Sequence, residues 1–204
     1  MERRAVDNRE LARIAVFAAL VIVGGLVSIP VGTVPITLQT LAVLLAGAVL
    51  GPVHGALSVC VVLVLAAAGL PVLAGGTGGL AEFVSPSGGY LFGFVLGAVL
   101  VGAVMRAGAR VASAAGRSPV SWPVTLVACL AGEVGIYALG IPWTAMATGL
   151  TLGETLVSAL IFLPGDALKI ALAVAAVQLL WRAYPAAFPQ ALRGQTGTRE
   201  SRAA

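Results

Sequence analysis

A stretch of 68 consecutive residues, between Arg13 and Glu82, contains no Asp, Glu, Lys or Arg. Only His54 interrupts this stretch as a side chain that can become charged near neutral pH. One bilayer crossing takes about 20 apolar residues, so the stretch is long enough for about three crossings with short connections. Charged residues make up 10% of the chain, against about 25% in soluble domains. We therefore expect a polytopic membrane protein.

The crossings are expected to be helices. The apolar stretches are continuous, whereas the strands of a transmembrane barrel alternate apolar and polar residues. Only 6% of the residues are aromatic, which also argues against a barrel. The 26 glycines suit helices that approach one another closely, because lipid gives no hydrophobic driving force between helices. The sequence thus predicts an all-α membrane protein.

Six apolar runs are bounded by charges, proline or glycine, and each is expected to cross the membrane. The cluster at residues 51–55 contains Gly51, Pro52 and Gly55 and predicts a tight hairpin between the second and third runs. These features predict a six-transmembrane-helix bundle over residues 1–184, followed by a flexible cytoplasmic tail over 185–204. The six runs are Leu11–Ser28, Ile36–Val53, Gly55–Leu70, Tyr90–Met105, Pro123–Gly140 and Thr155–Trp181.

Basic residues lie on one side of these six spans. Eleven of the twelve fall in the segments that share a side with the two termini, and the opposite loops contain none. The positive-inside rule then predicts that both termini are cytoplasmic. This placement also argues against nucleic acid as the partner of a chain with net charge +4.

The exterior loops are expected at Pro30–Pro35, Pro71–Gly89 and Ile141–Glu154. The middle loop has six glycines within residues 75–89, which allows close approach of its backbone to a ligand. It is either a flexible connector or a lid over a binding site. In the second case Gly75, Gly76 and Thr77 are candidate ligand contacts.

Asp166 and Lys169 lie inside the last apolar run, where an ionisable side chain costs about 2.5–3.5 kcal/mol. Their i, i+3 spacing puts them on one helix face, and Pro164-Gly165 before them is expected to break or kink the helix. Two readings follow. The segment binds a ligand, or the two residues form a purely structural ion pair in a membrane scaffold.

Glu133 is a third charge within the membrane, at a depth that we expect to be within about 6 Å of that of Asp166. The similar depth makes a shared polar cavity feasible. The alternatives are that Glu133 is protonated and only hydrogen-bonded, or that it faces another helix. Some polar and aromatic residues are candidates for the same pocket, with ordinary packing as the alternative. They are Gln39, Thr40, Tyr90, Tyr137 and Trp143.

Enzyme and metal-site patterns fit poorly. The only lysine stands between Leu168 and Ile170, so no phosphate-binding P-loop is present. A single intramembrane Asp argues against an aspartyl protease, which needs two carboxylates sharing a proton. His54, Cys60 and Cys129 are too few and too far apart for a usual metal site, so we expect no metal.

The first run contains Ala15 and Ala19 in small-xxx-small spacing. This spacing permits close helix contact, either within the bundle or with a partner.

Four motifs occur in order along the chain: Val34-Pro35-Ile36-Thr37-Leu38-Gln39-Thr40-Leu41, Gly69-Leu70-Pro71-Val72-Leu73-Ala74-Gly75-Gly76, Ser85-Pro86-Ser87-Gly88-Gly89-Tyr90-Leu91 and Leu163-Pro164-Gly165-Asp166-Ala167-Leu168-Lys169. With these motifs the chain resembles the BioY family, the biotin-binding S-components of bacterial energy-coupling-factor vitamin transporters. The resemblance extends from about Arg13 to Trp181.

The resemblance implies a membrane subunit that captures biotin outside a bacterial cell. It delivers biotin inward with a transmembrane coupling protein and a pair of cytoplasmic ATPases. Biotin is its cargo, and no cofactor and no enzymatic activity are implied. In the family the Asp and Lys of the last motif contact biotin, which corresponds to Asp166 and Lys169. An Ala-x-x-x-Ala surface of the first helix contacts the coupling protein, which corresponds to Ala15 and Ala19. An S-component for another vitamin is the alternative within this class.

Overall fold

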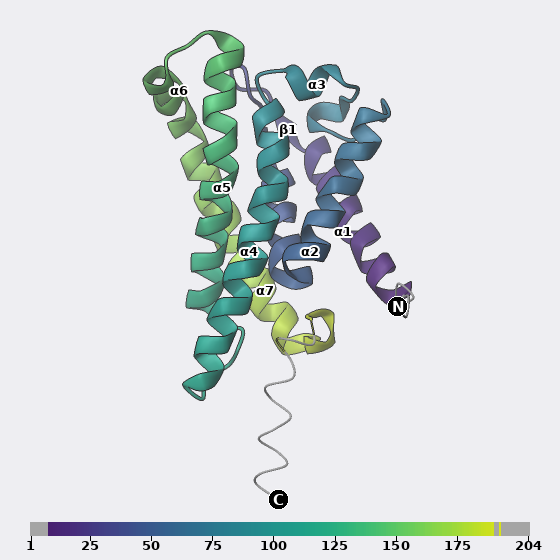
Figure 1. The fold of residues 1–204 in the computed structure, drawn as a ribbon, viewed down its shortest axis with the longest axis vertical. Coiled ribbons are helices and arrows are strands. Elements are labelled where there is room, and N and C mark those ends of the chain that lie inside the picture. The colour runs from purple at the N-terminus through teal and green to yellow at the C-terminus, as the bar shows by residue number, and fades with distance from the viewer. Residues whose placement is uncertain (1–7, 190–191, 193–204) are drawn as a thin grey trace, which may run out of the picture.

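The computed structural model describes residues 8–189 and residue 192, and these form a bundle of long helices (Figure 1). Two short strands pair antiparallel, with Ser28 opposite Thr37 and Ile29 opposite Ile36. The long helices are α1 (Asn8–Leu26), α2 (Gln39–Ala67), α4 (Gly88–Ala114), α5 (Trp122–Thr148) and α7 (Leu163–Ala183). The shorter elements are β1 (Ser28–Ile29), β2 (Ile36–Thr37), α3 (Ala81–Val84), α6 (Leu152–Ala159) and the 3₁₀ turns η1 (Ala74–Gly76), η2 (Leu160–Phe162) and η3 (Pro185–Ala187).

Four helical segments within residues 8–189 and 192 are long and apolar enough to cross a membrane. The helix α1 is 19 residues long and carries the charged residues Arg9, Glu10 and Arg13 near its start, so its apolar part is shorter. The all-helical membrane fold expected from the sequence is therefore confirmed. The four segments are Gln39–Ala67, Gly88–Ala114, Trp122–Thr148 and Leu152–Ala183.

The segment α2 consists of two helical halves that fold back on each other at Gly51. Gly51 has φ 82° and ψ 178°, a backbone conformation that is open to glycine and costly for residues with a Cβ. A Cβ on Gly55 would lie 2.9 Å from the Ala46 carbonyl oxygen and from Gly47 Cα. Positions nine residues apart in one straight helix are separated by about 13 Å, so this closeness requires a reversal. The predicted hairpin at residues 51–55 is confirmed.

Two helices extend further than the sequence predicted. The helix α4 continues past Met105 through Arg106 and Arg110 to Ala114, because an alanine-rich segment stays helical after it leaves the apolar layer. The helix α5 continues past Gly140 and includes Pro142. Proline removes one backbone donor but is tolerated in membrane helices whose neighbours satisfy the freed groups. Most of the predicted exterior loop Ile141–Glu154 is therefore helical.

The last predicted span is divided into α6, the turn η2 and α7. Pro164 stands at the start of α7 and has no N–H to donate to the carbonyl of Leu160. The Leu163 N–H bonds that carbonyl instead, in the tighter 3₁₀ pattern. The irregularity predicted at Pro164-Gly165 is thus displaced by one turn toward the N-terminus.

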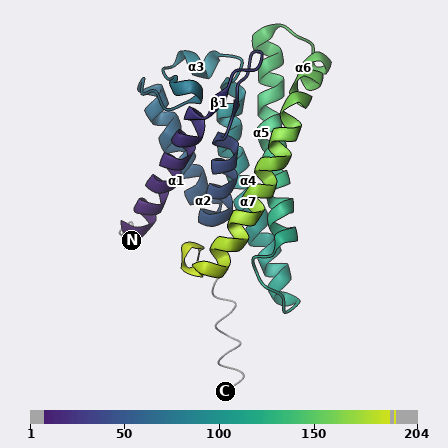
Figure 2. The ribbon, with the colours of Figure 1, turned by 180° about the vertical axis from the view of Figure 1, so that it is seen from behind.

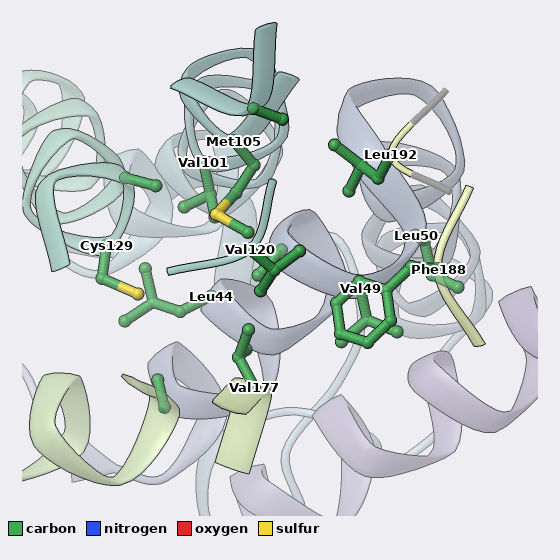
Figure 3. Close-up of a cluster of buried hydrophobic side chains, with 14 of the residues drawn as sticks. Leu44, Val49, Leu50, Val101, Met105, Val120, Cys129, Val177, Phe188 and Leu192 are labelled. Carbon is green, nitrogen blue, oxygen red and sulfur yellow. The ribbon is translucent and has the colours of Figure 1, made fainter. Parts of the chain in front are cut away.

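One apolar cluster joins α2, α4, α5 and α7 to the segment after α7 (Figure 3). Phe188 and Leu192 are 0% and 2% exposed within this cluster, which also contains Val49, Leu50 and Met105. Residues 185–189 and 192 belong to the predicted flexible tail, and they pack against the bundle. The rest of that predicted tail, residues 190–191 and 193–204, lies outside the described residues.

The two ends of the described chain lie at one end of the bundle, because Arg13 Nη2 donates a hydrogen bond of 2.7 Å to the Ala186 carbonyl oxygen. The connection between α4 and α5 lies toward the same end, and α7 crosses the bundle obliquely (Figure 2). The strands, α3 and α6 gather at the opposite end (Figures 1 and 2). Which of these two ends faces the cytoplasm stays a prediction.

Candidate functional site

A polar cavity of about 270 Å³ lies toward the end of the bundle that holds the strands and α3. It collects residues from segments far apart in the sequence: the loop before α2, the glycine-rich loop, and helices α2, α4, α5 and α7. Its apolar wall includes Leu73, Leu91, Phe94, Ile136 and Phe162. Seven of the nine ligand-binding residues predicted from the sequence line it, namely Gln39, Thr77, Tyr90, Glu133, Tyr137, Asp166 and Lys169.

Asp166 and Lys169 form an ion pair in the wall of this cavity. Lys169 Nζ lies 3.0 Å from Asp166 Oδ1, and each residue is 6% exposed. The second carboxylate oxygen, Asp166 Oδ2, accepts a hydrogen bond from the Tyr137 hydroxyl of α5. The turn of helix between the two residues sets their spacing, and the bond to Tyr137 connects α7 to α5. The two residues lie on one face of α7, as their i, i+3 spacing predicted.

Three buried polar atoms in the cavity wall have no hydrogen-bond partner among the described residues. They are Gln39 Nε2, Thr40 Oγ1 and Glu133 Oε1. Gln39 is 2% exposed and Glu133 is 6% exposed. A buried polar atom without a partner costs about 1–3 kcal/mol, so three such atoms on one cavity point to a polar ligand.

The side chain of Gln39 is held in place by its neighbours. Its Oε1 lies 3.5 Å from the Thr37 hydroxyl, which also accepts a 3.3 Å hydrogen bond from the Gln39 backbone N–H. A Cβ on Gly25 of α1 would lie 2.7 Å from Gln39 Nε2, so the glycine makes room for the amide. These contacts fix where the amide donor points.

The glycine-rich loop contributes four polar residues to the cavity lining, namely Thr77, Glu82, Ser85 and Ser87. Gly75 and Gly76 have positive φ angles, 67° and 77°, and form the turn η1 without lining the cavity. Thr77 lines the cavity, and its hydroxyl donates a 3.2 Å hydrogen bond to the Ala74 carbonyl oxygen. The two glycines shape the turn beside the cavity, and their contact with a ligand stays a prediction.

Trp143 holds the far end of the same loop. Its Nε1 donates a 3.0 Å hydrogen bond to the Ser85 carbonyl oxygen, and Thr144 Oγ1 donates a 2.7 Å bond to the Pro86 carbonyl oxygen. Trp143 is not among the residues that line the cavity, although the sequence suggested it. Its indole instead attaches the loop to α5.

Sequence reasoning missed several residues that line the cavity. The loop and strand before α2 contribute residues 33–37, and the end of the glycine-rich loop contributes Ser85 and Ser87. These residues are small, apolar or hydroxyl-bearing, so no unfavourable burial marks them in the sequence. The available signals were their position next to Gln39 and Tyr90 and their place in two motifs of the family resemblance, which include residues 34–37, Ser85 and Ser87.

Ala15 and Ala19, the predicted partner-docking residues, are exposed on the outer surface of α1. Ala18 between them is 3% exposed and packs into the bundle. The small-xxx-small pair therefore does not serve helix packing within this chain. It leaves a shallow surface open to lipid or to another protein.

The fold and the cavity define a multi-pass helical membrane protein that encloses one polar site among apolar walls. The BioY family model matches residues 1–186, and the chain belongs to that family. It is 40% identical to the biotin transporter BioY of Rhizobium etli over 189 residues, covering 90% of this chain and 97% of the relative. It is 42% identical to the biotin transporter BioY of Rhodobacter capsulatus over 174 residues, covering 80% and 88%.

A crystal structure of an S-component for biotin from an ECF-type ABC transporter has the same fold. The two structures superpose with a TM-score of 0.78 at 34% sequence identity. The match covers 87% of this chain and 95% of that one.

Proposed function

We propose that this protein is the biotin-binding S-component of an energy-coupling-factor transporter and takes part in biotin uptake. The observation that carries the proposal is the set of unpartnered and paired polar groups that face one cavity inside an otherwise apolar bundle. Membership of the BioY family, with relatives named biotin transporters, supports biotin as the cargo. The relatives are transporters by name, and we propose no catalytic step and no cofactor.

The unpartnered atoms match the hydrogen bonds that a ureido group needs. The bicyclic head of biotin has one carbonyl acceptor and two N–H donors. Gln39 Nε2 is a donor and Glu133 Oε1 is an acceptor when ionised, while Thr40 Oγ1 can act as either. Biotin bound here would satisfy groups that the protein leaves without partners.

The Asp166–Lys169 pair supplies charged groups for the remaining polar atoms of the ligand. The ammonium of Lys169 has three donors, one of which points to Asp166 Oδ1. The other two are able to meet a ligand oxygen, and charge-assisted hydrogen bonds of this kind are the strong ones. Leu91, Phe94 and Ile136 form an apolar wall on which the carbon skeleton of biotin would pack.

We further propose that the cavity faces the outside of a bacterial cell and that both termini are cytoplasmic. The basic residues that end α4 and α7, Arg106, Arg110 and Arg182, stand at or beyond the cytoplasmic ends in this orientation. The glycine-rich loop, held by Trp143 and Thr144, then acts as an outer lid. Gly75, Gly76 and Thr77 give this lid its turn.

Ala15 and Ala19 are proposed to contact the transmembrane coupling protein, which works with a pair of ATPases. Their exposure leaves room for a partner helix to approach the backbone of α1 closely. Replacing Ala15 by Trp should abolish co-purification with the coupling protein while biotin binding persists. Loss of both activities would contradict a docking role.

Calorimetry on detergent-solubilised protein tests the proposal, with biotin and thiamin titrated separately. We expect saturable binding of biotin alone, loss of that binding in Asp166→Asn and in Lys169→Ala, and retained folding in both variants. Glu10→Gln is the matched control, because it also changes a carboxylate to an amide but lies on α1 outside the cavity.

Two results would overturn the assignment. Binding of another vitamin in place of biotin would keep the transporter class and change the cargo. No binding at all, with unfolding of the protein when either Asp166 or Lys169 is replaced, would instead indicate a scaffold in which the pair is purely structural.

A further inference from the structure

A second cavity, of about 370 Å³, adjoins the polar cavity at the end of the bundle where the strands and α6 lie. Its walls come from residues 31–34 of the β1–β2 loop, from α6 and from the turn η2. Several residues on its rim are exposed at the protein surface. Gly32 and Thr33 of the β1–β2 loop are exposed on this rim, whereas the exposed Val157 and Ile161 belong to the membrane-crossing segment Leu152–Ala183. The second cavity therefore reaches the surface of the protein.

The two cavities share a wall made of Thr33, Val34, Tyr90 and Phe162. Tyr90 is 8% exposed and packs edge-on against Tyr137, with ring centroids 6.1 Å apart. Val34 and Phe162 are only half-buried. Tyr90 is thus the well-packed part of this wall. Thr33, Val34 and Phe162 are less buried and form its weaker part.

The weaker part of the wall is held by few backbone bonds. Val34 belongs to a loop closed by two residue pairs of the β1–β2 ladder. Phe162 belongs to the 3₁₀ turn η2, which Pro164 separates from a regular helical pattern. Small movements of this loop or turn would connect the two cavities.

The chemistry of the second cavity suits passage better than tight binding. Hydroxyls of Thr144, Thr155 and Ser158 donate to backbone carbonyl oxygens at 2.7, 3.0 and 2.8 Å, so they are already satisfied. None of the described residues that line it is charged. The polar cavity, by contrast, contains an ion pair and three unpartnered polar atoms. A ligand would be held in the polar cavity and would move freely through the second.

We propose that the second cavity is the vestibule through which the ligand reaches the polar cavity, passing between Val34 and Phe162. The inference rests on the proposed function, since it takes biotin as the ligand, and adds the route by which biotin enters. The route runs beside α6, and the glycine-rich loop is not part of it.

Labelling of α6 tests this route. Ser158 lines the vestibule and is exposed, so Ser158→Cys can be modified with methanethiosulfonate reagents of increasing size. Cys60→Ala removes the half-buried native thiol, and Cys129 is fully buried. Leu156→Cys is the matched control, because it is exposed on the same helix and lines neither cavity.

Association and dissociation rates of tritiated biotin are the readout. We expect both rates to fall as the reagent grows, by about tenfold for the largest, while the Kd changes little because the bound state is untouched. Labelled Leu156→Cys should keep the unmodified rates. Val157→Cys lines the same cavity and gives an independent repeat, with the same slowing expected.

Two results would overturn the route. Unchanged rates in both labelled vestibule variants, with slowed rates in labelled Thr77→Cys, would place entry at the glycine-rich loop. Faster dissociation with unchanged association would make the second cavity part of the binding site. Absence of biotin binding by the unmodified protein would instead contradict the proposed function. Unchanged rates in labelled protein that still binds biotin would contradict only the route.

Discussion

Glycine has different surroundings in the α4–α5 pair and in the α6–α7 arm, the segment Leu152–Ala183. A Cβ on Gly93 would lie 2.7 Å from the Ile136 carbonyl oxygen, and one on Gly97 would lie 2.7 Å from Ile136 Cγ1. A Cβ on Gly153 or Gly165 would have no heavy atom within 4 Å. The α4–α5 pair is therefore built on backbone contact along its length, and the arm is not.

The arm is held to the bundle at separate points instead. Asp166 accepts a hydrogen bond from Tyr137 near the start of α7, and Gln178 Nε2 donates a 3.1 Å bond to Thr125 Oγ1 further along. Phe188, after the end of α7, is fully buried in the apolar cluster. The arm also carries Asp166, Lys169 and part of the vestibule wall, so a segment held at separate points contributes to the ligand site together with α2, α4 and α5.

Phe188→Ala should have the largest effect on stability, because it removes the apolar anchor of the arm. Truncation of a fully buried Phe costs about 3–5 kcal/mol. Unfolding in mixed detergent micelles measures the change. Tyr184→Ala, at a neighbouring position that is 58% exposed, should change the free energy of unfolding little. Equal effects of the two substitutions would contradict an anchoring role.

Gly93→Ala tests the α4–α5 side of the comparison. Its Cβ would press on the Ile136 backbone, which cannot move aside as a flexible side chain would, and overpacking of this kind costs about 2–3 kcal/mol. Gly165→Ala is the matched control in the arm and should stabilise by up to about 1 kcal/mol, because alanine favours the helix. Destabilisation by Gly165→Ala would show a close contact that the arm is inferred to lack.

Tyr137→Phe tests the connection between the arm and α5 at the ligand. The substitution removes the hydroxyl that donates to Asp166 Oδ2 and leaves the ring in place. Hydrogen bonds to charged groups contribute about 1.5 kcal/mol or more, which corresponds to about tenfold weaker biotin binding. Calorimetric titration gives the affinity, and Tyr184→Phe, outside the cavity, is the control. Unchanged affinity would show that Asp166 does not depend on this bond.

The helical membrane fold was predictable because charged residues are costly in lipid and are therefore rare in the spans. The hairpin was predictable from Gly51-Pro52 for a different reason. Proline interrupts the hydrogen bonds of a helix, and glycine adopts the backbone conformation that a reversal of the chain needs. The ends of α4 and α5 were not predictable in this way. The first arginine after a span marks the edge of the apolar layer, and the α4 helix continues beyond it. The predicted span ended at Gly140, but α5 continues through Pro142, which membrane helices tolerate.

The same energetic cost explains which parts of the site the sequence predicted. Asp166, Lys169 and Glu133 are charges inside apolar runs, and all three line the polar cavity. Residues 33–37 and Ser85 are compatible with any exterior loop, so nothing in their type marks them as a cavity wall. Their role depends on how the loops fold over the bundle, which is set by long-range contacts such as those of Trp143 and Thr144.

Gln178→Leu should have the smallest effect, because it removes one interhelical hydrogen bond and leaves Thr125 satisfied. Thr125 Oγ1 also donates a 3.0 Å bond to the Ser121 carbonyl oxygen, so no buried polar group loses its only partner. Interhelical hydrogen bonds in membranes contribute about 0.6 kcal/mol on average, and leucine recovers part of this by packing. Unfolding in mixed micelles should show a change near that size, with Gln178→Asn as the polar control. A loss as large as that of Phe188→Ala would instead make the middle of α7 as firmly held as its end, and the comparison with α4–α5 would then no longer hold.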